Sequence, residues 1–208
     1  MLMDLPQLAM KYNMDIRGVL HCGAHLAEEA PIYHAMRVTP VWWVEANPLV
    51  LPKVDQIIRL FPDQLLISAL IYSKDNEYID FNITNYDGMS SSILEFGTHP
   101  TFSPDTVFEH KIKLRTTTID TLVADCFVEA NFLNMDLQGA ELHALSGGVE
   151  YLAQVDYIMT EINNEEVYQG CAKVDQLDAL LTDFTRVETY WVPGQGWGDG
   201  LYVRTSLL

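Results

Sequence analysis

Basic residues and cysteines are scarce in this sequence. Its 208 residues include 12 Lys and Arg against 29 Asp and Glu, a formal net charge of −17. Nucleic acids and anionic membrane surfaces attract clustered cations. Because the sequence contains no such cluster, neither is expected as a partner. The three cysteines, Cys22, Cys126 and Cys171, form no metal-binding pattern and no disulfide framework. Such cysteine usage is typical of the reducing cytoplasm, and we expect a cytoplasmic protein without a bound metal.

Long apolar runs are also missing. The longest are much shorter than a bilayer span, so no transmembrane helix is expected. The N-terminal residues lack the basic start and apolar core of a secretory signal. Hydrophobic residues still make up 49% of the chain and aromatic residues 11%, which predicts a globular protein. A chain of this length is most simply one domain, residues 1–208, with its excess acid on the solvated surface.

Strand and helix signals alternate along most of the chain. Buried strands are predicted at Val19–Cys22, Val41–Val44, Leu65–Leu70, Phe132–Met135 and Tyr157–Ile162, and closing strands near Arg186–Val192 and Gly200–Arg204. Helices are predicted at Asp4–Lys11, Leu26–Met36, Ala140–Leu152 and Val174–Leu181, with one more opening at Asn47 and Pro48. Pro52 marks either a late start or a kink in that helix. Recurrent strand–helix units predict an α/β fold, a mostly parallel sheet with helices on both faces.

Residues 78–117 depart from this alternation. Tyr78–Thr84 and Lys111–Thr117 alternate polar and apolar residues, as half-buried strands do. The segment Asn85–Thr106 between them is rich in Ser, Gly and Pro. We therefore predict an antiparallel insertion with a long loop, either a mobile lid over a site or a plain surface connection. The lid interpretation makes its three consecutive serines, Ser90, Ser91 and Ser92, candidates to bind a polyhydroxylated substrate.

The first two predicted strands end at residues suited to a ribose-containing ligand. Gly23 follows the first strand and allows a sharp turn, and Glu45 ends the next one, where a carboxylate can bind ribose hydroxyls. This spacing also suits NAD. The dinucleotide fingerprint, however, needs three glycines, and here Glu28 and Glu29 lie beside the expected helix start, where carboxylates repel a pyrophosphate. A ligand with a ribose and a cationic centre but no phosphate fits better, and S-adenosylmethionine is such a ligand.

Two more acids are expected at the same sheet edge, where open α/β sheets bind ligands. Asp136 directly follows the strand Phe132–Met135, and Glu161 ends the strand Tyr157–Ile162. Asp136 could instead cap a helix, and Glu161 could serve the structure alone. Glu141 lies in a first helical turn and either contacts the substrate or only complements the helix dipole. For Trp197, core packing is favoured over stacking on a sugar.

Several stretches resemble the FkbM-type S-adenosylmethionine-dependent methyltransferases. They include LHCGAHLAEE, WVEANP and above all MDLQGAELHALSGG, followed by MTEINNEEVY and GWGDGLYVR. The resemblance covers about residues 17 to 204 and implies a class I methyltransferase, Rossmann-like sheet that transfers a methyl group. In many members the acceptor is a sugar or polyketide hydroxyl. His21, Ala27 and Gln138 depart from the family pattern, which has Asp, Gly and Glu at these positions.

The resemblance and the residues together predict an enzyme that methylates a sugar, a glycan or a small-molecule hydroxyl. Asp136 is the first candidate to orient or deprotonate the acceptor, followed by Glu161 and His25. The residues expected at the acceptor are Ser90, Ser91, Ser92 and Glu141. The residues expected to bind S-adenosylmethionine are Gly23, Ala24, His25, Glu45, Ala46, Asn47, Ala69, Leu70, Asp136 and Gln138. Two rival hypotheses are a non-catalytic module that binds a nucleoside or glycan, and an NAD-linked oxidoreductase.

Overall fold

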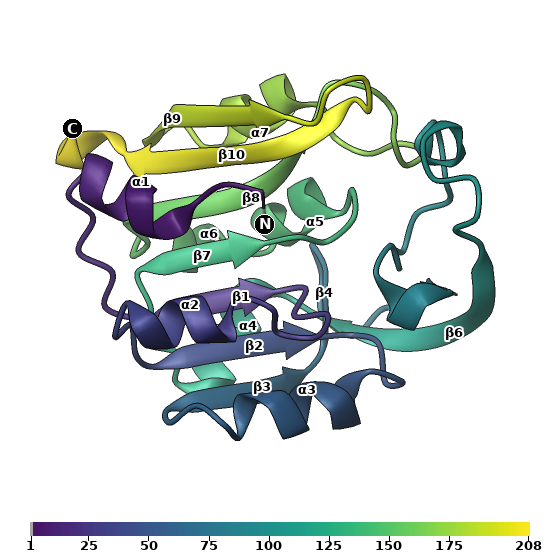
Figure 1. The fold of residues 1–208 in the computed structure, drawn as a ribbon, viewed down its shortest axis with the longest axis horizontal. Coiled ribbons are helices and arrows are strands. Elements are labelled where there is room, and N and C mark those ends of the chain that lie inside the picture. The colour runs from purple at the N-terminus through teal and green to yellow at the C-terminus, as the bar shows by residue number, and fades with distance from the viewer. Residues whose placement is uncertain (1) are drawn as a thin grey trace.

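A seven-stranded sheet forms the centre of the computed structural model, which describes residues 2–208 (Figure 1). The strand order is β3-β2-β1-β7-β8-β10-β9. Neighbouring strands from β3 to β8 are parallel, whereas β10 is antiparallel to both β8 and β9. This confirms the mostly parallel sheet. The strands are β1 (Val19–Cys22), β2 (Val41–Glu45), β3 (Gln64–Ser68), β7 (Phe132–Met135), β8 (Tyr157–Asn163), β9 (Phe184–Trp191) and β10 (Trp197–Arg204).

Helices cover both faces of the sheet, as predicted (Figure 1). One layer contains α1 (Leu5–Lys11), α2 (Ala30–Ala35) and α3 (Leu51–Ile58); the other contains α4 (Ile119–Cys126), α5 (Glu141–Ser146), α6 (Val149–Leu152) and α7 (Val174–Leu180). Along β1, alternate side chains enter the two cores: Val19 packs in the cluster of the first layer and Leu20 in that of the second. The chain closes in a short 3-10 turn, Thr205–Leu207.

Two helix predictions need correction, the late start that Pro52 allowed is observed, and one helix was not predicted. The predicted helix Leu26–Met36 begins only at Ala30, because His25 and Ala27 have positive φ angles of 44° and 54° that no α-helix contains. Glu28 and Glu29 therefore precede the helix. The helix after β2 also starts late, at Leu51, and Pro52 lies in its first turn, where proline is tolerated. Ala140–Leu152 is two helices, α5 and α6, separated at Gly147 and Gly148. The sequence analysis missed α4, whose N-cap Thr118 accepts a hydrogen bond from the Thr121 N–H.

The insertion is a second, three-stranded sheet with the order β4-β6-β5. Its long strands, β5 (Tyr78–Thr84) and β6 (Phe108–Thr117), are antiparallel, which confirms the predicted pairing. The predicted strand Leu65–Leu70 is divided, because β3 ends at Ser68 and the short β4 (Leu70–Ile71) pairs with β6. The loop between β5 and β6 contains two 3-10 turns, Tyr86–Gly88 and His99–Thr101. The insertion lies beside the carboxyl ends of β1, β2 and β7 (Figure 1).

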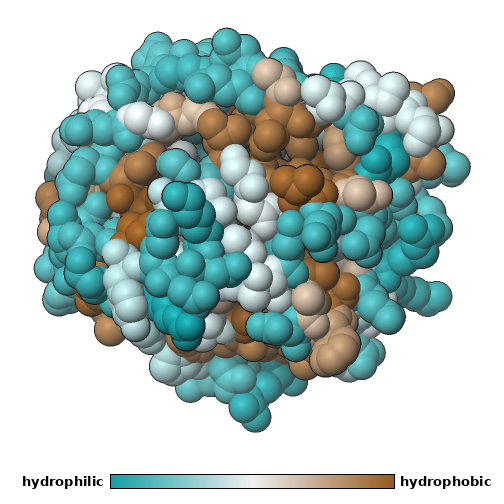
Figure 2. Space-filling model, turned by 180° about the vertical axis from the view of Figure 1, so that it is seen from behind, coloured by the Kyte–Doolittle hydropathy of each residue, from teal (hydrophilic) through white to brown (hydrophobic). Residues whose placement is uncertain are grey.

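The face seen in Figure 2 is hydrophilic along much of its rim, with hydrophobic residues exposed between the polar ones toward its middle. Over residues 2–208, no helix has both the length and the apolar character needed to span a bilayer. Cys22 and Cys171 are buried and Cys126 is exposed, and all three are free thiols.

Candidate active site

A cavity of about 380 Å³ opens at the carboxyl edge of the main sheet. Ligands of open α/β sheets bind at this edge, and the volume lies within the range of small-molecule pockets. Every residue predicted to bind a cofactor and every candidate base lines the cavity, so the structure brings together Gly23, Ala24, His25, Glu45, Ala46, Asn47, Ala69, Leu70, Asp136, Gln138 and Glu161. Their individual roles stay predictions.

The turn after β1 brings two strand ends into direct contact. The N–H groups of Gly23 and Ala24 both donate to the carbonyl oxygen of Val44 on β2. Gly23 has a φ of +90°, and a Cβ atom built there would lie only 1.9 Å from the carbonyl oxygen of Asp136. Only glycine fits such a contact. Ala27, which stands where many family members have glycine, keeps the left-handed backbone that a glycine would favour.

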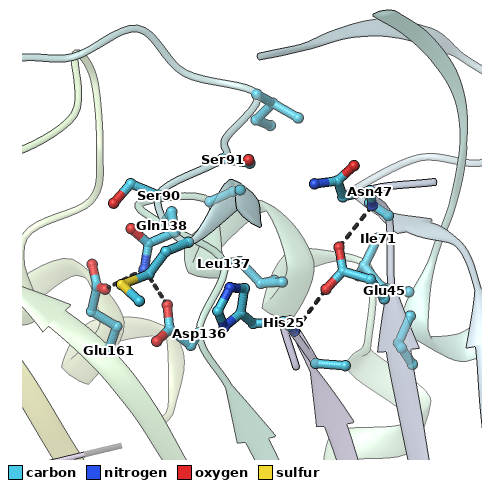
Figure 3. A pocket seen from close by; sticks show the side chains of 18 of the residues that line it. His25, Glu45, Asn47, Ile71, Ser90, Ser91, Asp136, Leu137, Gln138 and Glu161 are labelled. Carbon is cyan, nitrogen blue, oxygen red and sulfur yellow. Dashed lines mark hydrogen bonds between the residues drawn. The ribbon is translucent and has the colours of Figure 1, made fainter. Parts of the chain in front are cut away.

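Glu45 ends β2 at one end of the cavity (Figure 3). Its Oε2 accepts the His25 N–H at 2.8 Å, and its Oε1 accepts the Asn47 N–H at 2.7 Å. Burial raises the pKa of Glu45, while these hydrogen bonds act in the opposite direction. Each carboxylate oxygen can accept more than one hydrogen bond. Glu45 is therefore fixed in place by the backbone and can still accept both hydroxyls of a ribose.

His25 lies between the two ends of the cavity (Figure 3). Its Nδ1 is 2.6 Å from a carboxylate oxygen of Glu28, and its Nε2 is buried without a hydrogen-bond partner among the described residues. Burial lowers the pKa of His25, but the hydrogen bond and charge of Glu28 outweigh it and leave the pKa raised. The ring is thus oriented by Glu28, with one nitrogen available to a ligand. In contrast, His21 is buried in a structural network, hydrogen-bonded to Tyr33 and Asn134.

Two carboxylates share one amide at the other end of the cavity (Figure 3). The Nε2 of Gln138 donates to Asp136 at 2.5 Å and to Glu161 at 3.2 Å. The hydroxyl of Tyr168 donates to the Oε1 of Gln138 at 2.5 Å, which fixes the direction of the amide. A glutamate at position 138 would instead bring a third carboxylate to this place. The glutamine at position 138, where the family pattern has glutamate, therefore links the two acids through its amide hydrogen bonds.

Glu161 is 4% exposed in β8, and burial raises its pKa well above the usual range, with the nearby charges of Asp136 and Glu141 adding to the effect. Glu141 was predicted either to contact the substrate or only to complement the helix dipole, and a substrate contact stays a prediction. Glu141 lies outside the cavity lining and accepts the N–H groups of Leu137 and Gly139 at 2.8 and 3.3 Å. Its carboxylate supports the turn after β7.

Replacing Glu161 by Gln should stabilise the protein at neutral pH. Because the pKa of Glu161 is raised on folding, the folded state holds a proton that the unfolded chain releases from about pH 4.5 upward. The wild-type free energy of unfolding therefore falls as the pH rises through this window, by about 1.4 kcal/mol for each unit of the raised pKa. Thermal unfolding between about pH 5 and pH 8 should show a melting-temperature advantage for Glu161→Gln that grows with pH. Exposed Glu129→Gln is the control; a pH-independent advantage would contradict the prediction.

The loop between β5 and β6 and the segment after β8 complete the wall beside these acids. Ser90 and Ser91 line the cavity, whereas Ser92 lies outside the lining and its hydroxyl donates to the Gln138 carbonyl at 2.7 Å. The substrate contacts of all three serines stay predictions. Residues that sequence reasoning did not assign to the site also line it; they include Glu28, Met89, His99, Phe102, Tyr168 and Trp197. Tyr168 and Trp197 belong to the MTEINNEEVY and GWGDGLYVR stretches, so the resemblance contained a signal for them. Core packing was favoured for Trp197; it packs against the cluster of Val167, Tyr168 and Cys171 and also lines the cavity.

A comparison of the sequence with known protein families finds a match over most of the chain. Residues 21–188, from the end of β1 into β9, match the family described as "Methyltransferase FkbM domain". The chain belongs to the FkbM methyltransferase family.

The FkbM chain also resembles individual proteins. It is 29% identical over 152 residues to the 2-O-methyltransferase NoeI of Sinorhizobium fredii, a match that covers 70% of this chain and 62% of NoeI. Among solved structures it resembles an S-adenosylmethionine-dependent methyltransferase from Clostridium acetobutylicum, with a TM-score of 0.56, 7% identity and coverage of 96% and 89%. The N-methyltransferase NodS of Bradyrhizobium japonicum gives a TM-score of 0.53, 9% identity and coverage of 96% and 92%. These structures confirm the class I methyltransferase fold.

The FkbM enzyme uses S-adenosylmethionine, and the residues of the cavity fit this cofactor. Of the described residues that line the cavity, five are carboxylates, Glu28, Glu29, Glu45, Asp136 and Glu161, and none is Lys or Arg. Such a lining favours a cationic sulfonium and ammonium and repels a pyrophosphate. The FkbM chain thus combines the class I methyltransferase fold with a lining that fits S-adenosylmethionine, and this lining disfavours the NAD-linked hypothesis.

Proposed function

We propose that this methyltransferase methylates a hydroxyl oxygen of a sugar or glycan. The observation that carries the proposal is the pair of Asp136 and Glu161, both bonded to the amide of Gln138 on the cavity wall. A neutral alcohol is a weak nucleophile and needs a base, and a carboxylate pair provides one. The name of NoeI, a 2-O-methyltransferase, also supports transfer to oxygen.

The cavity wall supports a sugar as the owner of that hydroxyl. Beside the two acids it presents the Ser90 and Ser91 side chains, the His99 imidazole and the rings of Phe102 and Trp197. Hydroxyls and carboxylates can bind sugar hydroxyls, and aromatic rings can stack on the apolar face of a sugar. Burial lowers the pKa of His99, so this ring is a neutral hydrogen-bonding group near pH 7.

S-adenosylmethionine, when bound, supplies a methyl group on a positively charged sulfur. Glu45 and the turn at Gly23 would hold the ribose and methionyl parts of the cofactor. The apolar side chains of Ala69 and Leu70 would face its adenine ring. Asp136 would accept the hydroxyl proton as the acceptor oxygen forms its bond to the methyl carbon. The electron pair of the broken carbon–sulfur bond would stay on the sulfur, which becomes neutral. Holding the two partners in line supplies much of the rate.

Gln138 and Tyr168 would position the base. The Tyr168 hydroxyl directs the Gln138 amide so that its N–H groups face the carboxylates. Glu161, whose pKa is raised by burial and by the charge of Asp136, would retain a proton when Asp136 is ionised, because two close carboxylates do not readily ionise together. Of the two carboxyl groups, Asp136 alone would then be free to take up the proton of the acceptor hydroxyl.

A labelling experiment tests this function. Purified protein is incubated with S-adenosylmethionine carrying a ¹³C methyl group and with sugars, glycans, primary amines and thiols in separate reactions. We expect ¹³C-methyl ethers on sugar hydroxyls, detected by mass and by the carbon chemical shift of an O-methyl group. Transfer to nitrogen or sulfur, with none to sugar oxygen, would overturn the proposal and leave the methyltransferase assignment intact.

A further inference from the structure

We propose that the acceptor is a phosphate-free sugar, uncharged or bearing an amine, and not a sugar phosphate or nucleotide-linked sugar. The inference rests on the proposed sugar O-methylation and adds the charge class of the acceptor. It is carried by the charge of the cavity: carboxylates line it from end to end, and across the described residues no Lys or Arg reaches its wall. A phosphate needs a cation or a row of free backbone N–H groups to bind.

Three lysines around the insertion are already paired with carboxylates, and Arg115 on β6 is hydrogen-bonded to the Asn76 side chain. Lys53 on α3 contacts Asp87 at 2.6 Å, Lys111 on β6 contacts Glu95 at 2.9 Å, and Lys113 contacts Asp80 at 3.3 Å. Binding a phosphate with one of them would first break an existing ion pair. Within the cavity, the imidazole of His25 has a raised pKa, and its Nδ1 is 2.6 Å from Glu28. Over the described residues, the lining therefore offers an acceptor phosphate no Lys or Arg and only a histidine that a carboxylate already binds.

Four backbone N–H groups at the strand ends are already bonded to the protein's own carboxylates. The N–H groups of Leu137 and Gly139 are bonded to Glu141, and those of His25 and Asn47 are bonded to Glu45. The turns that form anion sites in other α/β proteins are therefore occupied here by the protein's own carboxylates. The net charge of −17 adds a general repulsion toward polyanions.

The polar groups at the acceptor end match a neutral sugar instead. His99 is 5% exposed and lines the cavity; its Nε2 is 3.2 Å from the Ser90 hydroxyl, and its Nδ1 lacks a partner within residues 2–208. A buried imidazole nitrogen without a partner, on a residue that lines a cavity, favours a ligand with hydroxyl groups. An amine on the sugar would also be attracted by the carboxylate of Asp136.

Matched acceptor pairs test the inference. The protein and S-adenosylmethionine are combined with the methyl glycoside, the 1-phosphate and the nucleotide-linked form of glucose, galactose, mannose and glucosamine. Methyl transfer is followed by product mass and by release of S-adenosylhomocysteine. We expect the methyl glycosides to be methylated with a kcat/KM at least about 10-fold above that of their phosphorylated partners, a factor typical of charge effects on encounter.

A charge placed at the mouth of the cavity provides the second readout. Met89 lines the cavity and is 61% exposed, whereas Met10 on α1 is 76% exposed and lies outside the cavity lining. Met89→Lys should raise the relative rate on a sugar 1-phosphate several-fold. Met10→Lys carries the same net charge and should leave the ratio of the two rates unchanged.

The outcomes separate the inference from the proposed function. If phosphorylated or nucleotide-linked sugars are methylated as fast as the methyl glycosides, the inference is wrong and sugar O-methylation stands. If Met10→Lys changes the ratio as much as Met89→Lys does, the preference comes from overall charge and the cavity-based inference is overturned. If no sugar of the panel gains a methyl group on oxygen while the protein binds its cofactor, the proposed function fails and this inference fails with it.

Discussion

Replacing Asp136 by Asn should abolish most methyl transfer while leaving the fold and cofactor binding in place. Asparagine has the shape of aspartate, and its carbonyl oxygen can still accept the Gln138 amide hydrogen. It cannot take a proton from an alcohol near neutral pH, so the loss should be the contribution of a general base, about 10²–10⁴-fold in kcat. Single-turnover kinetics with a saturating sugar acceptor measures this loss, and calorimetry should give a cofactor affinity within a few-fold of wild type.

A control separates catalysis from charge removal. Asp80→Asn makes the same chemical change on the exposed face of β5, where Asp80 is paired with Lys113. That variant should keep the wild-type rate. Near-native turnover in Asp136→Asn would assign Asp136 a structural role and move the base to Glu161 or His25, both of which line the same cavity.

Replacing Gly23 by Ala should damage both stability and cofactor binding. The added methyl group would lie 1.9 Å from the Asp136 carbonyl oxygen, so the ends of β1 and β7 must separate. The left-handed backbone costs a non-glycine residue about 1–2 kcal/mol, and the overlap adds about 1–3 kcal/mol, as overpacking does elsewhere. Thermal unfolding should show a drop of about 2–4 °C for each kcal/mol. Cofactor affinity should fall at least about 10-fold, because the displaced atoms form the cavity wall.

Substitutions at two other glycines measure the backbone cost and the steric overlap separately. Gly194 has a φ of +73° with nothing within 4 Å of a built Cβ, so Gly194→Ala reports the backbone cost alone. Gly97 has no positive φ, but its Cβ would lie 1.9 Å from the Glu166 carbonyl oxygen. Gly97→Ala therefore reports an overlap away from the strand ends. Should Gly23→Ala unfold at the same temperature as Gly194→Ala, the contact between β1 and β7 would not be as tight as the structure has it.

The central strands were predictable because burial on both faces leaves a strong sequence signal. Val19–Cys22 and Phe132–Met135 are mostly apolar runs ended by Gly23 and Asp136, and the structure has both strands with these bounds. The positions at the carboxyl edge followed from that order, which is why the predicted cofactor residues all line one cavity. Chain connectivity alone brings these residues together.

Two kinds of feature were not predictable in the same way. The backbone after β1 turns left-handed at His25 and Ala27, and tertiary contacts with the ends of β2 and β7 outweigh the helical pattern of these residues. The cavity wall beside Asp136 and Glu161 is formed by the loop between β5 and β6 and by the segment after β8. Loop contacts of this kind leave no periodic pattern in the sequence. His99 reaches the cavity because Gly97 and Thr98 bond to the segment after β8, a pairing between residues some 70 positions apart in the sequence.

The cavity's carboxylates also bear on how the enzyme parts with its spent cofactor. The sulfur is cationic before methyl transfer and neutral afterwards, so each turnover removes one positive charge from the bound molecule. A lining of five carboxylates attracts the charged form more strongly than the neutral one. Product release limits the rate of many enzymes. On the proposed function, methyl transfer therefore weakens the electrostatic attraction between the cavity and the spent cofactor, which favours its exchange for a fresh, cationic one.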